Sequence, residues 1–229
     1  MKTNFSKILR GHNSFQEYNH SGYKHHINKI IDVWNGGNSD DYGILRLFRL
    51  SIITSLLFFP GVLIDELFKS KNYITRKILV EFYVLIKTAL PLVVLYNHWY
   101  VYPLFCFLNI YLLIETYLYL FSKIFLEHQH FRTSNMRTLL LLVFNFIESG
   151  LSFAVIYMSG NYLNVPIHSI DAIYYSFVTS ATIGYGEIHP ITTIGKEIVT
   201  IQIFCSIAFL VLFFNFFSGK TSQPKDQDF

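Results

Sequence analysis

The segment Thr182-Ile183-Gly184-Tyr185-Gly186 has the residue types and spacing that a cation site made of backbone oxygens requires. Its two glycines stand at alternate positions, and glycine enters the left-handed region of backbone space without a steric penalty. A backbone that alternates between right- and left-handed residues turns successive carbonyl oxygens toward one axis. Oxygens stacked along an axis can take the place of the water around a dehydrated cation.

The residues on both sides extend this pattern. Tyr174-Tyr175 precedes the segment, and Glu187 and Pro190 follow it. With these flanks, residues 172–190 resemble the pore loop of tetrameric potassium channels of the bacterial type, with one pore loop per subunit, whose filter usually reads Thr-Val-Gly-Tyr-Gly. The alternative is a plain turn between two helices. Apolar spans on both sides and a half-length helix before the segment argue against it.

The resemblance, which runs from Thr138 to Ser218, implies the ligands and the assembly of the protein. It implies that K+ is the permeant ion, that no cofactor is needed and that four identical chains surround one pore. It also implies that Tyr185 points away from the axis and packs on the pore helix. K+ binding is assigned by the resemblance to the carbonyl oxygens of Thr182, Ile183, Gly184 and Tyr185 and to the Thr182 hydroxyl, with Gly186 completing the filter.

A short helix is predicted directly before the filter. Ser169 is expected to be its N-cap and Asp171 falls in its first turn, and both residue types are favourable at a helix start. The C-terminal end of this helix then points at the base of the filter, where its partial negative charge favours a cation. Residues expected to support the filter are Tyr174, Tyr175, Val178 and Glu187.

The chain departs from the family pattern at two places. Val178 stands where some bacterial members carry a glutamate that pairs with the acid after the filter, so Glu187 needs another partner. Ser206 aligns with the flexible glycine of many inner helices, which puts bending there in doubt. Near the end of the inner helix, Phe213 and Phe214 are candidates for a dry constriction that gates by excluding water. The alternative is that these rings face lipid or neighbouring helices.

The composition predicts an all-α protein that is embedded in a membrane. The 229 residues are 52% hydrophobic and 14% charged, whereas a soluble domain is about 25% charged. A spanning helix needs about 20 apolar residues. Four segments meet this length, and they are Ile78–Trp99, Tyr102–Leu126, Thr138–Met158 and Ile194–Ser218.

The basic residues predict the orientation of these spans. The first two spans are joined without Lys or Arg and the last two with Lys196 alone, whereas basic residues gather at the other connections. Since positive loops stay in the cytoplasm, both termini are predicted to be cytoplasmic, in the plasma or inner membrane. Residues 42–68, with Arg46 and Arg49 on a polar side, are then interfacial or re-entrant. The alternative is a fifth span with the N-terminus outside.

This topology divides the chain into five parts. The predicted divisions are a polar cytoplasmic tail at 1–41, an interfacial or re-entrant helix at 42–68, a transmembrane hairpin at 69–130, a potassium channel pore domain at 131–219 and a short cytoplasmic tail at 220–229.

Charged residues inside the predicted hairpin are expected to pair. In an antiparallel hairpin, facing residues have a constant index sum, which places Lys87 level with Glu115 and Glu81 level with Lys123. Unpaired charges at membrane depth are costly, so such residues are functional candidates. Glu148 in the third span is a competing partner for Lys87. The pairs act either as a clamp for the hairpin or in gating.

Several functions are disfavoured by what the sequence lacks. It has no arginine repeat of the voltage-sensor type, no domain-sized segment after the last span, and no nucleophile–base pair or metal cluster of an enzyme. The expected partners are K+, lipid and further copies of the chain, and no nucleic acid is expected. The alternatives are a poorly selective cation channel or a non-conducting membrane interaction subunit, and the intact segment from Thr182 to Gly186 argues against both.

Overall fold

The computed structural model describes residues 23–35, 43–68, 73–125, 135–165 and 168–221. The chain forms two compact units, an N-terminal unit at Met1–Leu85 and a C-terminal unit at Ile86–Phe229. Within the described residues every regular element is a helix, and the one β-bridge is isolated. The fold is therefore that of an all-α protein, as predicted.

Four helices are long and apolar enough to cross a membrane among the described residues. They cover Ile78–Tyr96, Pro103–Phe125, Met136–Met158 and Thr193–Phe214, which confirms the four predicted spans to within a few residues at each end. The corresponding helices are α5 (Tyr73–Tyr96), α6 (Pro103–Phe125), α7 (Asn135–Met158) and α9 (Thr193–Thr221). The protein is thus an integral membrane protein.

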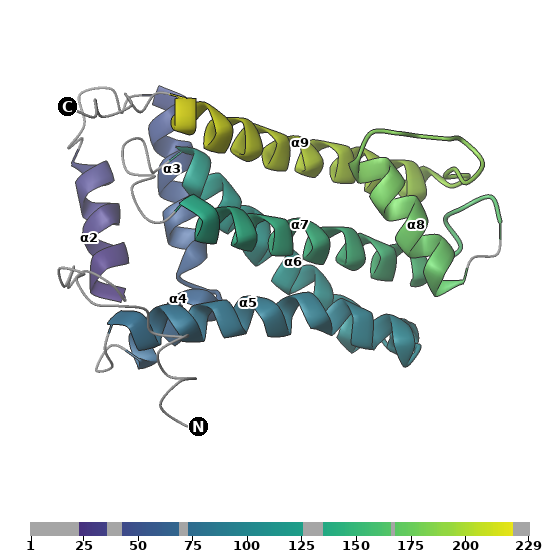
Figure 1. Cartoon of the computed structure of the whole chain (residues 1–229), viewed down its shortest axis with the longest axis horizontal. Coiled ribbons are helices and arrows are strands. Elements are labelled where there is room, and N and C mark those ends of the chain that lie inside the picture. Colours follow the sequence, from purple (N-terminus) through teal and green to yellow (C-terminus); the bar gives the residue numbers. More distant parts are fainter. Residues whose placement is uncertain (1–22, 36–42, 69–72, 126–134, 166–167, 222–229) are drawn as a thin grey trace, which may run out of the picture. The chain divides into compact units, whose positions relative to one another are not determined.

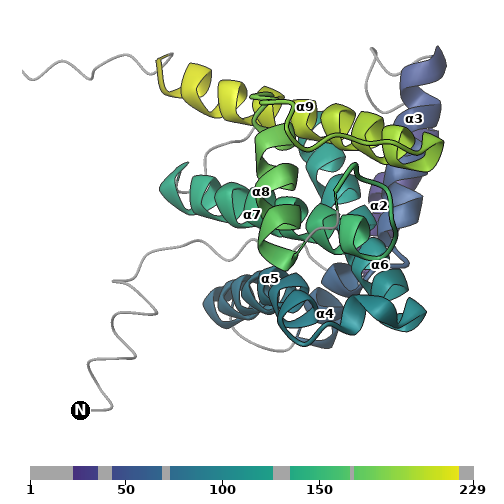
Figure 2. The ribbon, with the colours of Figure 1, turned by 90° about the vertical axis from the view of Figure 1, so that its right-hand side faces the viewer.

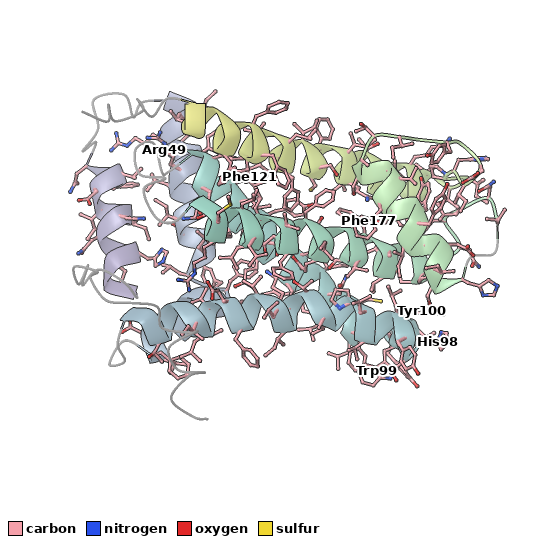
Figure 3. The ribbon with its side chains drawn as sticks, viewed as in Figure 1. Arg49, His98, Trp99, Tyr100, Phe121 and Phe177 are labelled. Atoms are coloured by element: carbon pink, nitrogen blue, oxygen red, sulfur yellow. The ribbon has the colours of Figure 1, made fainter. Side chains whose placement is uncertain are left out.

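The N-terminal unit contains short helices before the first span. They are α2 (Tyr23–Trp34), α3 (Gly43–Leu56) and α4 (Pro60–Leu67). The predicted polar tail thus includes a helix at its end, and residues 42–68 form two helices because Pro60 occupies the first turn of α4, where its missing N–H is harmless. The Arg46 side chain donates to Val33 O of α2 at 3.0 Å. Arg49, which lies on α3 (Figure 3) and was expected on a polar side, is instead buried.

The hairpin between α5 and α6 turns through an aromatic tip. His98 has a left-handed backbone that ends the first arm, and the short helix η1 (Trp99–Val101) follows. The Trp99 ring stacks on Phe105 at 4.7 Å, and the three labelled residues of the tip gather at one end of the C-terminal unit (Figure 3). Trp and Tyr concentrate at membrane–water interfaces, so this tip is suited to one membrane surface.

The C-terminal unit packs three long helices and one short helix around a shared core. Helix α7 contacts α6, α9 and the short helix α8 (Ser169–Ser180), and α8 also lies against α9 (Figures 1 and 2). Aromatic rings join these elements edge to face, since Phe146 meets Phe177 at 6.2 Å and Phe209 at 5.4 Å. A side chain at Gly150 would lie 2.7 Å from the Phe177 ring, so this glycine permits the close approach of α8 to α7.

Candidate functional site

The short helix α8 begins one residue earlier than predicted. His168 is its N-cap, and the Asp171 carboxylate accepts a hydrogen bond from His168 N at 2.9 Å. Ser169, predicted as the cap, is the first helical residue, and its hydroxyl donates to Leu95 O at 3.3 Å. Asp171 still lies in the first turn, where its charge is favourable with the helix dipole. The prediction for Asp171 holds and the one for Ser169 is wrong.

The chain leaves α8 directly into the candidate filter. Three backbone hydrogen bonds continue the helical winding as far as the loop. They run from Ala181 N to Phe177 O (2.9 Å), from Thr182 N to Thr179 O (3.0 Å) and from Ile183 N to Val178 O (3.0 Å). The C-terminal end of the helix, with its partial negative charge, therefore meets the loop at Thr182.

The backbone of the loop alternates in hand. Positive φ occurs at Thr182 (57°), Gly184 (58°) and Gly186 (87°), and the intervening residues are not among those with positive φ. An added Cβ at Gly184 would meet nothing within 4 Å. The need for glycine there is therefore conformational and not a matter of space.

Thr182 takes the left-handed conformation without being glycine, which the sequence does not reveal. Such a conformation is uncommon for residues other than glycine and costs on the order of 1 kcal/mol or more. It is held because Thr182 N bonds back to the helix while the following residues continue the alternation. Threonine is β-branched, and its local preferences do not predict a left-handed conformation.

A tyrosine pair and an acid brace the loop from the side of α8. The ring of Tyr185 lies parallel to that of Tyr174, with centroids 6.5 Å apart and an interplanar angle of 1°. The Tyr174 hydroxyl donates to the Glu187 carboxylate. This hydrogen bond raises the pKa of Tyr174 to about 12, so its hydroxyl keeps its proton near neutral pH. In the family pattern a glutamate at the position of Val178 would pair with Glu187. In this chain Glu187 has Tyr174 as a partner.

A buried amide on α9 holds the other side of α8. Gln202 is 0% exposed, and its Nε2 lies 2.8 Å from Ser176 O, 2.9 Å from Ser176 Oγ and 2.7 Å from Ser180 Oγ. Its Oε1 accepts from Tyr157 OH of α7 at 2.6 Å. Polar side chains bond across helices in membranes in this way. Sequence reasoning passed over Gln202, although an amide within an apolar span was a signal for it.

Tyr175, the second residue of the tyrosine pair before the loop, packs against helix α7. Tyr175 is buried, and its ring meets the Tyr157 ring at 5.0 Å. The Ser176 hydroxyl donates to Gly150 O at 2.6 Å. Helices α7, α8 and α9 are therefore tied together by both aromatic and polar contacts behind the loop.

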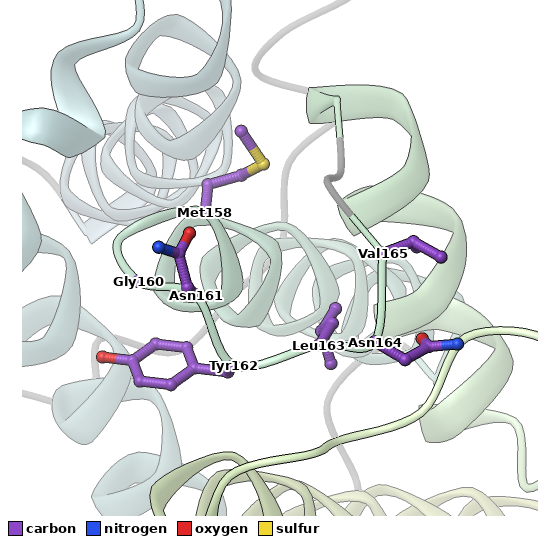
Figure 4. A pocket seen from close by; sticks show the side chains of 7 residues that line it. All are labelled: Met158, Gly160, Asn161, Tyr162, Leu163, Asn164 and Val165. Carbon is purple, nitrogen blue, oxygen red and sulfur yellow. The ribbon is translucent and has the colours of Figure 1, made fainter.

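The chain before α8 and the chain after the filter lie side by side. Asn164 Nδ2 donates to Glu187 O at 3.0 Å, and His189 N donates to Asn164 Oδ1 at 3.0 Å. The loop that carries Asn164 also lines a cavity of about 500 Å³, shown in Figure 4. The lining residues are Met158, Gly160, Asn161, Tyr162, Leu163, Asn164 and Val165.

Of the two acids expected as alternative partners for Lys87, the structure pairs it with Glu115. Lys87 Nζ lies 3.3 Å from Glu115 Oε2, and both residues are 5% exposed. The competing acid, Glu148, is 1% exposed and accepts from Thr116 Oγ1 at 2.6 Å. Glu81 and Lys123 belong to different units, so their pairing stays a prediction.

The residues considered for a gate differ in their surroundings. Ser206 is buried, and its hydroxyl donates to Gln202 O at 2.9 Å within α9. Phe213 packs against the core, whereas Phe214 is 73% exposed on the single chain. Of the two rings, Phe214 is therefore the one free to face a neighbouring copy, lipid or a pore.

Helices α7 and α9 are thus two membrane-spanning helices, and between them lie the half-length helix α8 and a loop of alternating hand. Residues 139–223, which cover these elements, match the ion channel family model. This part of the chain is therefore similar to ion channels. No curated protein and no solved structure matches the chain.

Proposed function

We propose that the protein is a potassium-selective channel subunit that conducts K+ passively as a homotetramer. The filter is formed by the five residues from Thr182 to Gly186. The carbonyl oxygens of the first four and the Thr182 hydroxyl bind K+. The proposed location is the cell membrane, with both termini in the cytoplasm because the basic residues gather at the connections on that side.

One observation carries this proposal, namely the alternation of hand at Thr182, Gly184 and Gly186. A peptide chain that alternates in this way presents successive carbonyl oxygens to one side. Such a row of oxygens replaces the hydration shell of a dehydrated cation. The negative end of α8 adjoins the first of these residues and favours a positive ion there.

Selectivity needs a filter that keeps its shape, and the surroundings of the loop support this. Tyr185 and Tyr174 lie parallel beside it, and Glu187 is bonded to Tyr174. Behind α8, Gln202 bonds to two serines of the helix. These contacts hold both the loop and the helix that carries it.

The tetramer is proposed because one chain supplies one loop, and a ring of oxygens needs several. Helix α9 has apolar side chains that the single chain leaves exposed, among them Ile201 (56%), Phe204 (69%) and Ile207 (46%). An unpartnered apolar face of this kind fits lipid or neighbouring subunits. Four copies of the loop around one axis close the pore.

Flux through the purified protein tests the proposal. The full chain is reconstituted in liposomes that contain K+ or Na+, and ion efflux is followed after the membrane potential is clamped. K+ flux well above Na+ flux is the expected result. Equal fluxes of K+ and Na+ would point to a poorly selective cation channel, and no flux of either ion from tetrameric protein would point to a membrane interaction subunit.

A further inference from the structure

Two segments far apart in the chain pair beside the outer end of the loop. Ile191 N donates to Tyr162 O and Asn164 N donates to His189 O, each at 3.0 Å. Between these bonds, Leu163 and Pro190 form an antiparallel bridge. The segment that precedes α8 and the segment that follows the filter therefore hold each other in a fixed register.

The side chain of Asn164 continues this pairing past the last backbone bond. Its Oδ1 accepts from His189 N and its Nδ2 donates to Glu187 O, each at 3.0 Å. The amide of Asn164 therefore bonds to two peptide groups of the segment that follows the filter.

Glu187 is the first residue after the filter, and it is held twice. Its carbonyl oxygen accepts from Asn164 and its carboxylate accepts from the Tyr174 hydroxyl. The first contact fixes the peptide group and the second fixes the side chain. Removal of either leaves Glu187 able to rotate, and that rotation passes directly to Gly186, which tolerates many backbone conformations.

We propose that Asn164 is a positioning residue that keeps the outer end of the filter in its conducting conformation. The inference rests on the proposed function and adds to it a residue outside the pore loop. Carbonyl oxygens that face one axis repel one another when no cation lies between them. The hold of Asn164 on Glu187 therefore matters most when the filter holds few ions, which is at low external K+.

Flux at two external K+ concentrations tests this inference on the full chain in liposomes. Asn164→Ala is expected to lower the ratio of K+ to Na+ flux about tenfold at low external K+, the factor that corresponds to the loss of about one hydrogen bond. High external K+ is expected to restore the ratio. Asn164→Asp keeps the acceptor for His189 N but loses the donor to Glu187 O, so it is expected to behave like Asn164→Ala.

Asn161→Ala is the matched control, because Asn161 lies on the same loop, lines the same cavity and is exposed. It is expected to match the wild type at both concentrations. An unchanged flux ratio in Asn164→Ala at low K+ overturns the inference. A loss that high K+ does not restore also overturns it, since the residue is then structural only.

Amide hydrogen exchange gives a second readout that needs no ion flux. The His189 N–H donates to Asn164 Oδ1, so it is expected to exchange about tenfold faster in Asn164→Ala than in Asn161→Ala. Equal exchange in the two variants overturns the inference. A wild type without K+ preference overturns the proposed function. The exchange rate of the His189 N–H in the two variants then decides by itself whether Asn164 holds this segment.

Discussion

Lys87 on α5 and Glu115 on α6 form a buried ion pair, with 3.3 Å between the ammonium nitrogen and the nearer carboxylate oxygen. Both residues lie within predicted spans and both are 5% exposed. Two charges taken out of water are stable only when they are paired. The pair therefore joins the two arms of the hairpin, and each buried charge depends on the other for its stability.

This dependence predicts a non-additive pair of substitutions. Lys87→Leu leaves the Glu115 carboxylate buried without its ammonium partner and is expected to cost about 3–5 kcal/mol. The double variant Lys87→Leu with Glu115→Leu is expected to recover part of that lost stability. The double variant Lys87→Leu with Glu148→Leu is not expected to recover it. Thermal melting in detergent measures all three. Lys196→Leu, which removes an exposed lysine, is the control, and additive losses for Lys87 and Glu115 would contradict the prediction.

The left-handed backbone of the proposed filter predicts the effect of a single methyl group. Gly184 has φ of 58° with open space around its Cβ position. Gly184→Ala is thus expected to strain the backbone by about 1 kcal/mol or more and to abolish selective K+ flux while the oligomer still forms. Liposome flux and size-exclusion chromatography check the two parts. Undiminished selective flux would falsify the assignment of the filter.

The buried amide network predicts coupling between α7 and α9. Gln202→Leu leaves Tyr157 OH and Ser180 Oγ without a bond that each now makes, so a loss of about 1–3 kcal/mol is expected. Because Tyr157→Phe removes one end of the same bond, the double variant is expected to cost less than the two single losses together. Detergent melting measures the cycle. Thr200→Val, which removes an exposed hydroxyl from the same helix, is expected to change little.

The exposed ring of Phe214 predicts where a dry gate is to be sought. Phe214 is 73% exposed in the single chain, while Phe213 packs against the core. If four Phe214 rings narrow the inner end of the pore, Phe214→Ser is expected to wet that constriction and raise the open probability. Selectivity is expected to stay unchanged because the filter is untouched. Single-channel recording decides, and an unchanged open probability places the gate elsewhere, most simply at the filter.

Phe213→Ser separates a gate from a packing effect. Its ring belongs to the core of the C-terminal unit, so its loss is expected to lower the melting temperature and to leave the open probability near that of the wild type. The opposite pattern, with a change of gating in Phe213→Ser alone, would assign the constriction to that ring.

The spans and the left-handed backbone at Gly184 and Gly186 were predictable from the sequence, because both rest on local chemistry. A run of about 20 apolar residues has few stable states other than a spanning helix, and all four predicted spans are present. Gly184 and Gly186 predict the left-handed backbone at their positions, because glycine alone adopts that conformation freely. The half-length helix between the last two spans follows from its own short apolar stretch.

The partners of the polar residues were decided only by the tertiary structure. The index sum places Lys87 level with Glu115, but depth does not say how far each helix is rotated. The structure places the Lys87 ammonium on Glu115, while Glu148 accepts a hydrogen bond from Thr116. In the same way, nothing local distinguishes Gln202 from a residue that faces lipid. Rotation about a helix axis is fixed by packing against neighbours, and packing involves residues distant in the chain.

Backbone details at the edges of the elements also came from the fold alone. His168 caps α8 instead of Ser169 because a shift of one residue changes little in local preference. Thr182 is left-handed, against the tendency of its residue type, since the helix before it and the glycines after it determine its conformation. Asn164 bonds to Glu187 O and His189 N, which lie 23 and 25 positions further along the chain, and sequence patterns of short range do not contain such contacts.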